Sequence, residues 1–325
     1  MSFDTVKKYQ KNVIKLLDSS FKKNRLVHTY LFVGSKGSLK KEAALYLASL
    51  LLCETNEACG ACKACKQIRK GTNPNVFLIA PETESIKKEQ ILTLEHEFSM
   101  TSASKRIFII EHIDKATIAG VNSLLKFLED ANENCYGILL TENINAVIPT
   151  IRSRSQIVNF LPISRNNILD ALWNRGIPGE LSQVISTLTN DLDEALELAA
   201  NEVMLRIIEL VKSVGMSIEE EEQDPYLVYL TQSKFLTEAA NKEYYIHFLN
   251  IFISLQHDKM KWLLYQKEDI VFEELLEQNQ IQLTMAQEIQ ILEIILSFKA
   301  KIGYSINMEL SIQAMMIEIV RCANG

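Results

Sequence analysis

Glycine, proline and long apolar runs are scarce in this chain. Its 325 residues include only 11 glycines and 6 prolines, so few positions interrupt regular structure and helix is favoured. No run of about 18 uncharged apolar residues occurs, which predicts that no helix spans a membrane. The first residues also lack the apolar core of a signal peptide. We therefore expect a cytoplasmic location.

Positive charge is in short supply as well. Lys and Arg number 34 against 41 Asp and Glu, a net charge of -7. This balance argues against a protein that binds nucleic acid through its overall charge, although it does not exclude a local basic patch. The hydrophobic share of 47% and the charged share of 23% are those of an ordinary globular protein. The length allows two or three domains with cores of their own.

Short apolar runs alternate with segments of helical spacing in the first half of the chain. Strands in this order are joined through helices that pack on the faces of the sheet, and such strands are parallel. We therefore predict a parallel α/β sheet with helices on both faces. The expected strands are residues 28–33, 76–80, 107–111, 137–141 and 157–160, and the expected helices are residues 3–23, 39–52, 86–98 and 115–130.

The turn after the first expected strand reads Gly-Ser-Lys-Gly-Ser-Leu-Lys-Lys from Gly34 to Lys41. A strand, a glycine turn and a helix form the context of the phosphate-binding loop G-x-x-x-x-G-K-[ST]. Gly34 and Lys40 match that pattern. Leu39 replaces its second glycine, and Lys41 replaces the hydroxyl that binds Mg²⁺, for which an ammonium group is no ligand. We interpret the loop as vestigial, with weak or no ATP binding. The alternative is an unrelated strand–helix turn.

Acidic residues follow the strand expected at residues 107–111. In nucleotide-switch domains a carboxylate at such a strand end faces the phosphate-bound metal, and its neighbour activates water. Here Glu111 ends the strand, His112 stands where the activating carboxylate would be, and Asp114 follows. We read Glu111 and Asp114 as a vestigial metal-facing pair. Asp114 as a helix N-cap and His112 as a general base are the alternatives.

Four of the six cysteines are bunched as C-x5-C-x2-C-x2-C at Cys53, Cys59, Cys62 and Cys65. Four thiolates at this spacing suit tetrahedral Zn²⁺, and a full set of protein ligands indicates a structural rather than a catalytic ion. Free thiols and an iron–sulfur cluster are the alternatives. In a reducing compartment disulfides are disfavoured.

After residue 163 the spacing is almost wholly helical. Short helices are expected at residues 164–173, 180–188 and 191–200, the last with Asp191 as its N-cap. Long amphipathic stretches follow, including residues 288–298 and 308–320. We expect the acidic run of residues 219–224 to be an exposed loop. The apolar faces of these helices suit either a monomer core or an interface with other chains.

Together these motifs resemble the AAA+ clamp-loader family. The resemblance implies an α/β plus all-α fold class: an AAA+ RecA-like parallel sheet core with a zinc module, a small helical lid domain and a C-terminal helical collar domain. The implied boundaries are 1–162 for the core, 163–203 for the lid and 204–325 for the collar, which closes a five-subunit ring. The similarity covers about residues 25–160, and its motifs are residues 34–41, the four cysteines, and residues 109–114, 122–129 and 150–156.

The segment Ser153-Arg154-Ser155 lies where the family has a Ser-Arg-Cys motif. The resemblance therefore implies that Arg154, next to the matching Ser153, reaches in trans the ATP of a neighbouring subunit as an arginine finger. Such a group stabilises the charge that develops on a transferred phosphate. Ser155 departs from the motif, but the arginine supplies the electrostatic effect. A surface arginine paired with a carboxylate is the alternative.

The resemblance implies a non-hydrolysing subunit of a clamp loader within a DNA polymerase III holoenzyme. Its expected partners are motor subunits of the gamma/tau kind, a delta subunit, the sliding clamp and, through the complex, primer–template DNA. Zn²⁺ is the expected cofactor, and ATP is bound weakly or not at all. Two other functions remain open: an ATP-hydrolysing motor subunit, and a zinc-dependent nucleic-acid-binding module on an inactive AAA+ scaffold.

Overall fold

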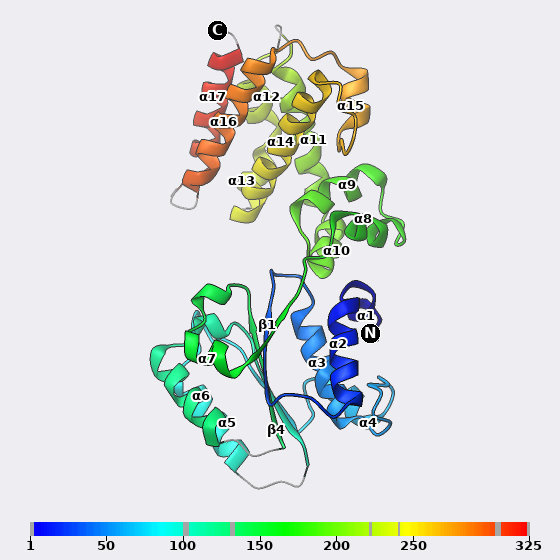
Figure 1. Cartoon of the computed structure of the whole chain (residues 1–325). Coiled ribbons are helices and arrows are strands. Elements are labelled where there is room, and N and C mark those ends of the chain that lie inside the picture. The colour runs from blue at the N-terminus through cyan, green and yellow to red at the C-terminus, as the bar shows by residue number, and fades with distance from the viewer. Residues whose placement is uncertain are drawn as a thin grey trace. The chain divides into compact units, whose positions relative to one another are not determined.

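The structure is a computed structural model that describes residues 3–99, 104–130, 134–220, 223–239, 241–302 and 307–323. The chain forms two units, Met1–Ile163 and Ser164–Gly325, and Figure 1 labels the helices α1 to α17 and the strands β1 and β4. Within the described ranges, no helix combines the length and apolar character needed to traverse a lipid bilayer. Whether the second unit consists of a lid, 163–203, and a collar, 204–325, stays a prediction.

The first unit is built on a five-stranded parallel sheet with the order β2-β3-β4-β1-β5. The parallel α/β core predicted from the alternation of apolar runs and helices is confirmed. Both faces of such a sheet are covered, which is why its strands are apolar almost throughout. The strands are β1 (Thr29–Val33), β2 (Val76–Ile79), β3 (Arg106–Ile110), β4 (Cys135–Thr141) and β5 (Gln156–Asn159).

Successive side chains of each strand enter two different hydrophobic cores. Tyr30 and Phe32 enter the core on one face, and Leu31 enters the core on the other. Figure 1 shows α2 and α3 on one side of the sheet and α5, α6 and α7 on the other. The first face carries α1 (Asp4–Tyr9), α2 (Lys11–Lys22), α3 (Lys40–Leu52) and α4 (Lys63–Arg69), and the second carries α5 (Lys88–Ser99), α6 (Ile118–Asp130) and α7 (Pro149–Arg154).

The single helix expected at residues 3–23 is wrong, because the chain leaves the helical conformation at Gln10. That residue has φ -117° and ψ 45° and separates α1 from α2. Its buried side-chain amide donates to the carbonyl oxygens of Ser38, at 3.0 Å, and Leu161, at 2.7 Å. These bonds tie the first helices to the loop after β1 and to the segment after β5.

The second unit is all-helical within its described residues. Ser164 and Asp191 cap α8 and α10 through their side-chain oxygens, so the predicted Asp191 cap is confirmed. The helices are α8 (Arg165–Trp173), α9 (Gly179–Leu188), α10 (Leu192–Ala200), α11 (Glu202–Ser217), α12 (Pro225–Gln232), α13 (Lys234–Ala239), α14 (Lys242–Leu263), α15 (Glu273–Gln278), α16 (Met285–Ile302) and α17 (Met308–Ala323).

The acidic run of residues 219–224 is not the wholly exposed loop that we expected. Glu219 is only 5% exposed, and its Oε1 accepts from Lys259 Nζ at 2.5 Å. Its Oε2 accepts from the backbone amides of Gln282 and Leu283. Residues 221 and 222 lie outside the described residues, and Asp224 caps α12. A buried lysine therefore recruits the first residue of the run, since a buried charge needs a partner.

A second carboxyl group faces the same lysine. Glu288 on α16 is fully buried, and its Oε1 lies 3.6 Å from Lys259 Nζ. Neither carboxyl oxygen of Glu288 has a hydrogen-bond partner within the described residues. Burial, reinforced by the charge of Glu219 and opposed by that of Lys259, raises the pKa of Glu288 to about 7. One buried cation thus faces two carboxyl groups, and Glu288 holds a proton more tightly than Glu219 does.

Stability should fall with rising pH because of Glu288. The native state binds this proton more tightly than the unfolded chain does, so the free energy of unfolding decreases between about pH 4.5 and 7. Glu288→Gln should remove about 2–3 kcal/mol of that decrease, as measured by urea denaturation of the chain from pH 5 to 8. Glu293→Gln, at an exposed position of the same helix, is the matched control. Parallel pH profiles for all three proteins would contradict the assignment.

Candidate functional site

The carboxyl ends of the parallel strands bring together the residues of the predicted vestigial phosphate loop and the predicted metal-facing pair. Such an edge is where open α/β sheets bind ligands. Gly34 follows β1, Glu111 follows β3, and Thr141 ends β4. The Gly34 amide donates to the Thr141 carbonyl at 3.2 Å. A Cβ on Gly34 would lie 2.7 Å from Ser38 Oγ and 2.8 Å from Phe160 Cβ, so only glycine fits there.

Leu39 adopts a backbone conformation that glycine reaches far more easily than leucine. Leu39 has φ 64° and ψ 29°, in the left-handed region, and immediately precedes α3. For a residue with a Cβ this conformation costs about 1–2 kcal/mol. The side chain packs against the core that contains α2 and α3. The turn therefore carries a side chain at the position where the phosphate-loop pattern has a glycine that allows close approach of a ligand.

Lys40 turns its ammonium group onto the loop itself. Its Nζ donates to the carbonyl oxygens of Gly34, at 2.6 Å, and Ser35, at 2.7 Å, and lies 3.3 Å from Ser38 Oγ. All three contacts are made within the loop that precedes α3. The lysine that would otherwise reach a phosphate is thus bound to backbone oxygens.

Lys41 and Glu111 form an ion pair across this edge. Lys41 Nζ lies 2.7 Å from Glu111 Oε1, and the carboxyl side chain is 17% exposed. Lys41, in the place of the magnesium-binding hydroxyl, therefore pairs its positive charge with Glu111, the carboxylate that would face the metal. Asp114 accepts from Thr141 Oγ1 at 2.6 Å, a contact that the sequence did not reveal.

Asp114 does not cap the following helix, so that alternative is wrong. Residues Ile113–Lys115 form a 3₁₀ turn, and α6 begins only at Ile118. Thr117 Oγ1 accepts from the Gly120 amide at 3.1 Å and so satisfies the first turn of α6. His112, in the place of a catalytic carboxylate, has φ 53° in the left-handed region. Its backbone makes the corner between β3 and the 3₁₀ turn.

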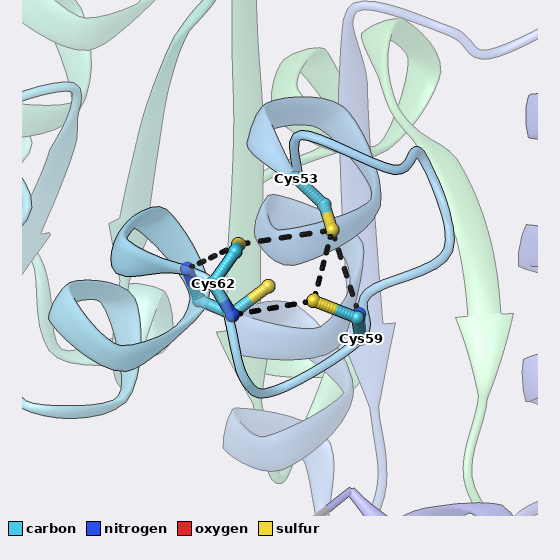
Figure 2. A group of neighbouring side chains, drawn as sticks. Cys53, Cys59 and Cys62 are labelled. Atoms are coloured by element: carbon cyan, nitrogen blue, oxygen red, sulfur yellow. Dashed lines mark hydrogen bonds between the residues drawn. The ribbon is translucent and has the colours of Figure 1, made fainter.

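The four clustered cysteines converge at the end of α3. Cys53 follows α3, Cys62 precedes α4 and Cys65 lies within it, and the side chains of Cys53, Cys59 and Cys62 point toward one another (Figure 2). All four Sγ atoms lie within 4.8 Å of one another, and Cys53 Sγ is 3.5 Å from Cys59 Sγ and 3.9 Å from Cys62 Sγ. Zn–S bonds of about 2.3 Å in a tetrahedron need sulfur separations of about 3.8 Å. The cluster fits such an ion.

Backbone amides point at the sulfur atoms, as thiolates require. The Cys59 amide lies 3.5 Å from Cys53 Sγ, the Cys62 amide 3.4 Å from Cys59 Sγ, and the Cys65 amide 3.4 Å from Cys62 Sγ. Burial opposes ionisation of Cys53, but hydrogen bonds from Thr55 and from backbone amides outweigh it and lower the pKa of that thiol to about 5. Burial raises the pKa of Cys65. A cation shared by the four sulfurs would favour ionisation of all four.

Arg154 ends the short helix α7 at the protein surface. One guanidinium nitrogen lies 2.8 Å from Glu129 Oε1, and the other lies 3.4 Å from the Thr150 carbonyl oxygen. The arginine side chain is 44% exposed and the glutamate side chain 57%. Ser153, beside it, is exposed and donates to the Thr150 carbonyl at 3.1 Å. Glu129 belongs to a motif used for the resemblance, yet its role as partner of Arg154 was missed, because the two residues are 25 positions apart.

Comparison with known proteins gives these features a context. A family model described as DNA polymerase III, delta subunit, matches residues 9–164. The chain is 29% identical to DNA polymerase III subunit delta' of Bacillus subtilis over 320 residues, which covers 95% of each protein. It is 31% identical to subunit delta' of Pseudomonas aeruginosa over 134 residues, 39% of this chain and 41% of that one. A gamma subunit-related protein of Thermotoga maritima aligns over 94% of this chain and 99% of its own, with 15% identity and a TM-score of 0.48.

The architecture predicted from the sequence, a parallel α/β core followed by an all-helical part, is confirmed. Its phosphate-loop turn and its acidic strand end lie at one edge of the sheet. The chain resembles subunit delta' of bacterial DNA polymerase III, in agreement with the motifs in the first half of the chain.

Proposed function

We propose that the chain is a non-hydrolysing subunit of a clamp-loader complex that acts in DNA replication. It would assemble with motor subunits of the gamma/tau kind and a delta subunit, and help place a sliding clamp on primer–template DNA. The similarity to a delta' subunit over 95% of both lengths supports this role. The division into a core, 1–162, a lid, 163–203, and a collar, 204–325, belongs to the same proposal.

The ion pair between Lys41 and Glu111 carries the non-hydrolysing part of the proposal. Hydrolysis of ATP in phosphate-loop enzymes needs Mg²⁺ held by a loop hydroxyl and an acidic strand end. Here an ammonium group takes the place of the hydroxyl and pairs with that carboxylate at 2.7 Å. Lys40 is bound to the loop carbonyls, and Leu39 adds a side chain to the turn. These contacts favour the proposal over a motor-type ATPase.

Arg154 is the residue by which the chain would act on a neighbour. A guanidinium group presents five donors in a planar fork, which suits the oxygens of a transferring phosphate. Arg154 is exposed at the end of α7. Its pair with Glu129 is a surface ion pair, a kind worth about 0–1 kcal/mol, so exchange of the carboxylate for a phosphate costs little. Ser153 would help to hold the end of α7 through its bond to Thr150.

The cysteine cluster would hold a structural zinc ion. Cys53, Cys59, Cys62 and Cys65 supply the four thiolates, leaving no open coordination position for water or substrate. The ion would contribute a cross-link between the end of α3 and the start of α4. No reaction step involves it.

Reconstitution tests the proposed function. We expect motor and delta subunits to load clamps onto primed DNA only when this chain is added, and the chain alone to hydrolyse no ATP, because its magnesium position holds Lys41. Clamp loading is measured by retention of labelled clamp on circular primed DNA, and turnover by phosphate release. Loading without the chain would contradict its role in the complex, and turnover by the chain alone would contradict its inactivity.

A further inference from the structure

The charge of this chain is distributed very unevenly. Residues 1–75, which precede β2, contain 14 Lys and Arg against 5 Asp and Glu, a net charge of +9. The remaining 250 residues contain 20 against 36, a net charge of -16. A zinc ion with four thiolates carries a net charge of about -2 and leaves most of the surplus in place. The acidic total therefore conceals one strongly basic segment.

Two helices of the basic segment each present lysines on a single exposed face. On α2, Lys11, Lys15 and Lys22 lie four and seven residues apart, which places them on one side of the helix. The apolar residues of α2, among them Leu17, point to the core instead. All three lysines are exposed.

The helix that follows the cysteine cluster repeats this arrangement. Lys63, Lys66 and Lys70 lie three and four residues apart and are exposed, while Cys65 and Ile68 are buried. Both α2 and α4 pack against α3, on the same face of the sheet. No ion pair within the described residues engages any of these six lysines, five of which lie in α2 and α4 while Lys70 is the C-cap of α4. We call these six residues the basic face.

The basic face suits a nucleic-acid backbone better than a protein partner. Protein interfaces are depleted in lysine and centred on large apolar side chains. On the described residues of these two helices, Leu16 is the one large apolar side chain that is exposed, with an exposed fraction of 38%. From Lys11 to Lys22 the helix rises about 17 Å, which matches about five phosphates of one DNA strand at about 3.4 Å each. Lysine ammonium groups recognise such phosphates as point charges.

We propose that the basic face of α2 and α4 binds the phosphodiester backbone of DNA without reading its sequence. The site lies on the zinc-module side of the core and uses neither Arg154 nor the phosphate-loop edge. It therefore does not depend on the proposed arginine finger, and either assignment can fail while the other holds. The cysteine cluster would fix the orientation of α4 and hence of three of the six lysines.

Fluorescence anisotropy with the zinc-loaded full chain and labelled duplex DNA of mixed sequence tests this site. Lys11→Gln/Lys15→Gln/Lys22→Gln and Lys63→Gln/Lys66→Gln/Lys70→Gln should each lower affinity at 50 mM salt by about tenfold or more. Each should also reduce the slope of log K against log salt concentration by about 2–3, since each phosphate contact contributes about 0.9. Far-UV circular dichroism and zinc content should be unchanged.

The matched control removes three exposed lysines outside the basic face, as Lys87→Gln/Lys88→Gln/Lys126→Gln. This variant should retain the affinity and the salt slope of the unaltered chain. Equal losses in the control and the basic-face variants, or no loss in either, would overturn the proposal. Poly-glutamate is the competitor that tests the choice of nucleic acid. If it displaces the labelled DNA as well as unlabelled DNA does at the same concentration of negative charge, the choice of nucleic acid is overturned and an acidic protein partner is indicated.

Discussion

Replacing Arg154 by alanine should greatly slow ATP hydrolysis at the one motor site that it faces, by about 10³-fold or more. An arginine finger supplied in trans is worth about 10³–10⁵ in kcat because it neutralises charge that develops on the transferring phosphate. The measurement is DNA-stimulated phosphate release by reconstituted complexes, in single-turnover conditions that resolve the individual sites. This chain contributes no turnover of its own under the proposal, so the loss is assigned to the neighbour.

Arg154→Lys is the matched variant, because it keeps the charge but loses the planar fork of donors. It should recover only a small part of the rate. Glu129→Gln removes the partner of Arg154 within the chain and should leave the rate within a few-fold of the unaltered complex, since a surface ion pair is weak. All variants must assemble to the same extent by size-exclusion chromatography. An unchanged rate with Arg154→Ala in assembled complexes would make Arg154 a surface residue paired with Glu129.

Removing zinc should have the second large effect. We expect one zinc ion per chain, and its extraction by a strong chelator should loosen residues 53–69 and lower the melting temperature of the first unit. Structural zinc sites in small peptides contribute about 10–16 kcal/mol of apparent binding free energy. In this chain zinc orders only a loop, because the sheet of the core forms without it. The loss of stability should therefore be smaller than in those peptides. Metal analysis and thermal denaturation, with and without added zinc, are the measurements.

Cys53→Ser should abolish stoichiometric zinc binding, because its sulfur lies 3.5 Å and 3.9 Å from the sulfurs of Cys59 and Cys62. Cys322→Ser is the matched control, since that thiol lies outside the cluster, and it should leave zinc content and melting temperature unchanged. Purified chain without zinc, with four thiols that react as fast as free cysteine, would show the site to be a group of unligated thiols. Absorption of visible light by the purified chain would indicate an iron–sulfur cluster instead.

The sheet could be predicted from sequence because its information is local. The strands β1, β3 and β4 are short runs of mostly apolar residues, and each is followed by polar residues or glycine where the strand leaves the core. The four cysteines lie within 13 residues, so their convergence also needed no knowledge of the fold. Both predictions depend only on the spacing of residues that are close together in the sequence.

The contacts that define the candidate site could not be predicted in the same way. Lys41 and Glu111 are 70 residues apart, and only the placement of β1 and β3 within one sheet brings them to the same edge. The break at Gln10 depends on two distant carbonyl groups. Glu219 looked like part of a solvated run because its partner Lys259 is 40 residues away. In each case a polar side chain is placed by a partner that is distant in the sequence and is brought close only by the fold.

The ion pair between Lys41 and Glu111 gives this edge of the sheet a counterion that belongs to the chain itself. A subunit that binds Mg²⁺ and ATP changes its charge and its contacts in every cycle. A carboxylate paired with a lysine of its own chain has a counterion without binding magnesium or nucleotide. In a ring whose other subunits change conformation as they bind and hydrolyse ATP, this chain would keep one conformation throughout the cycle.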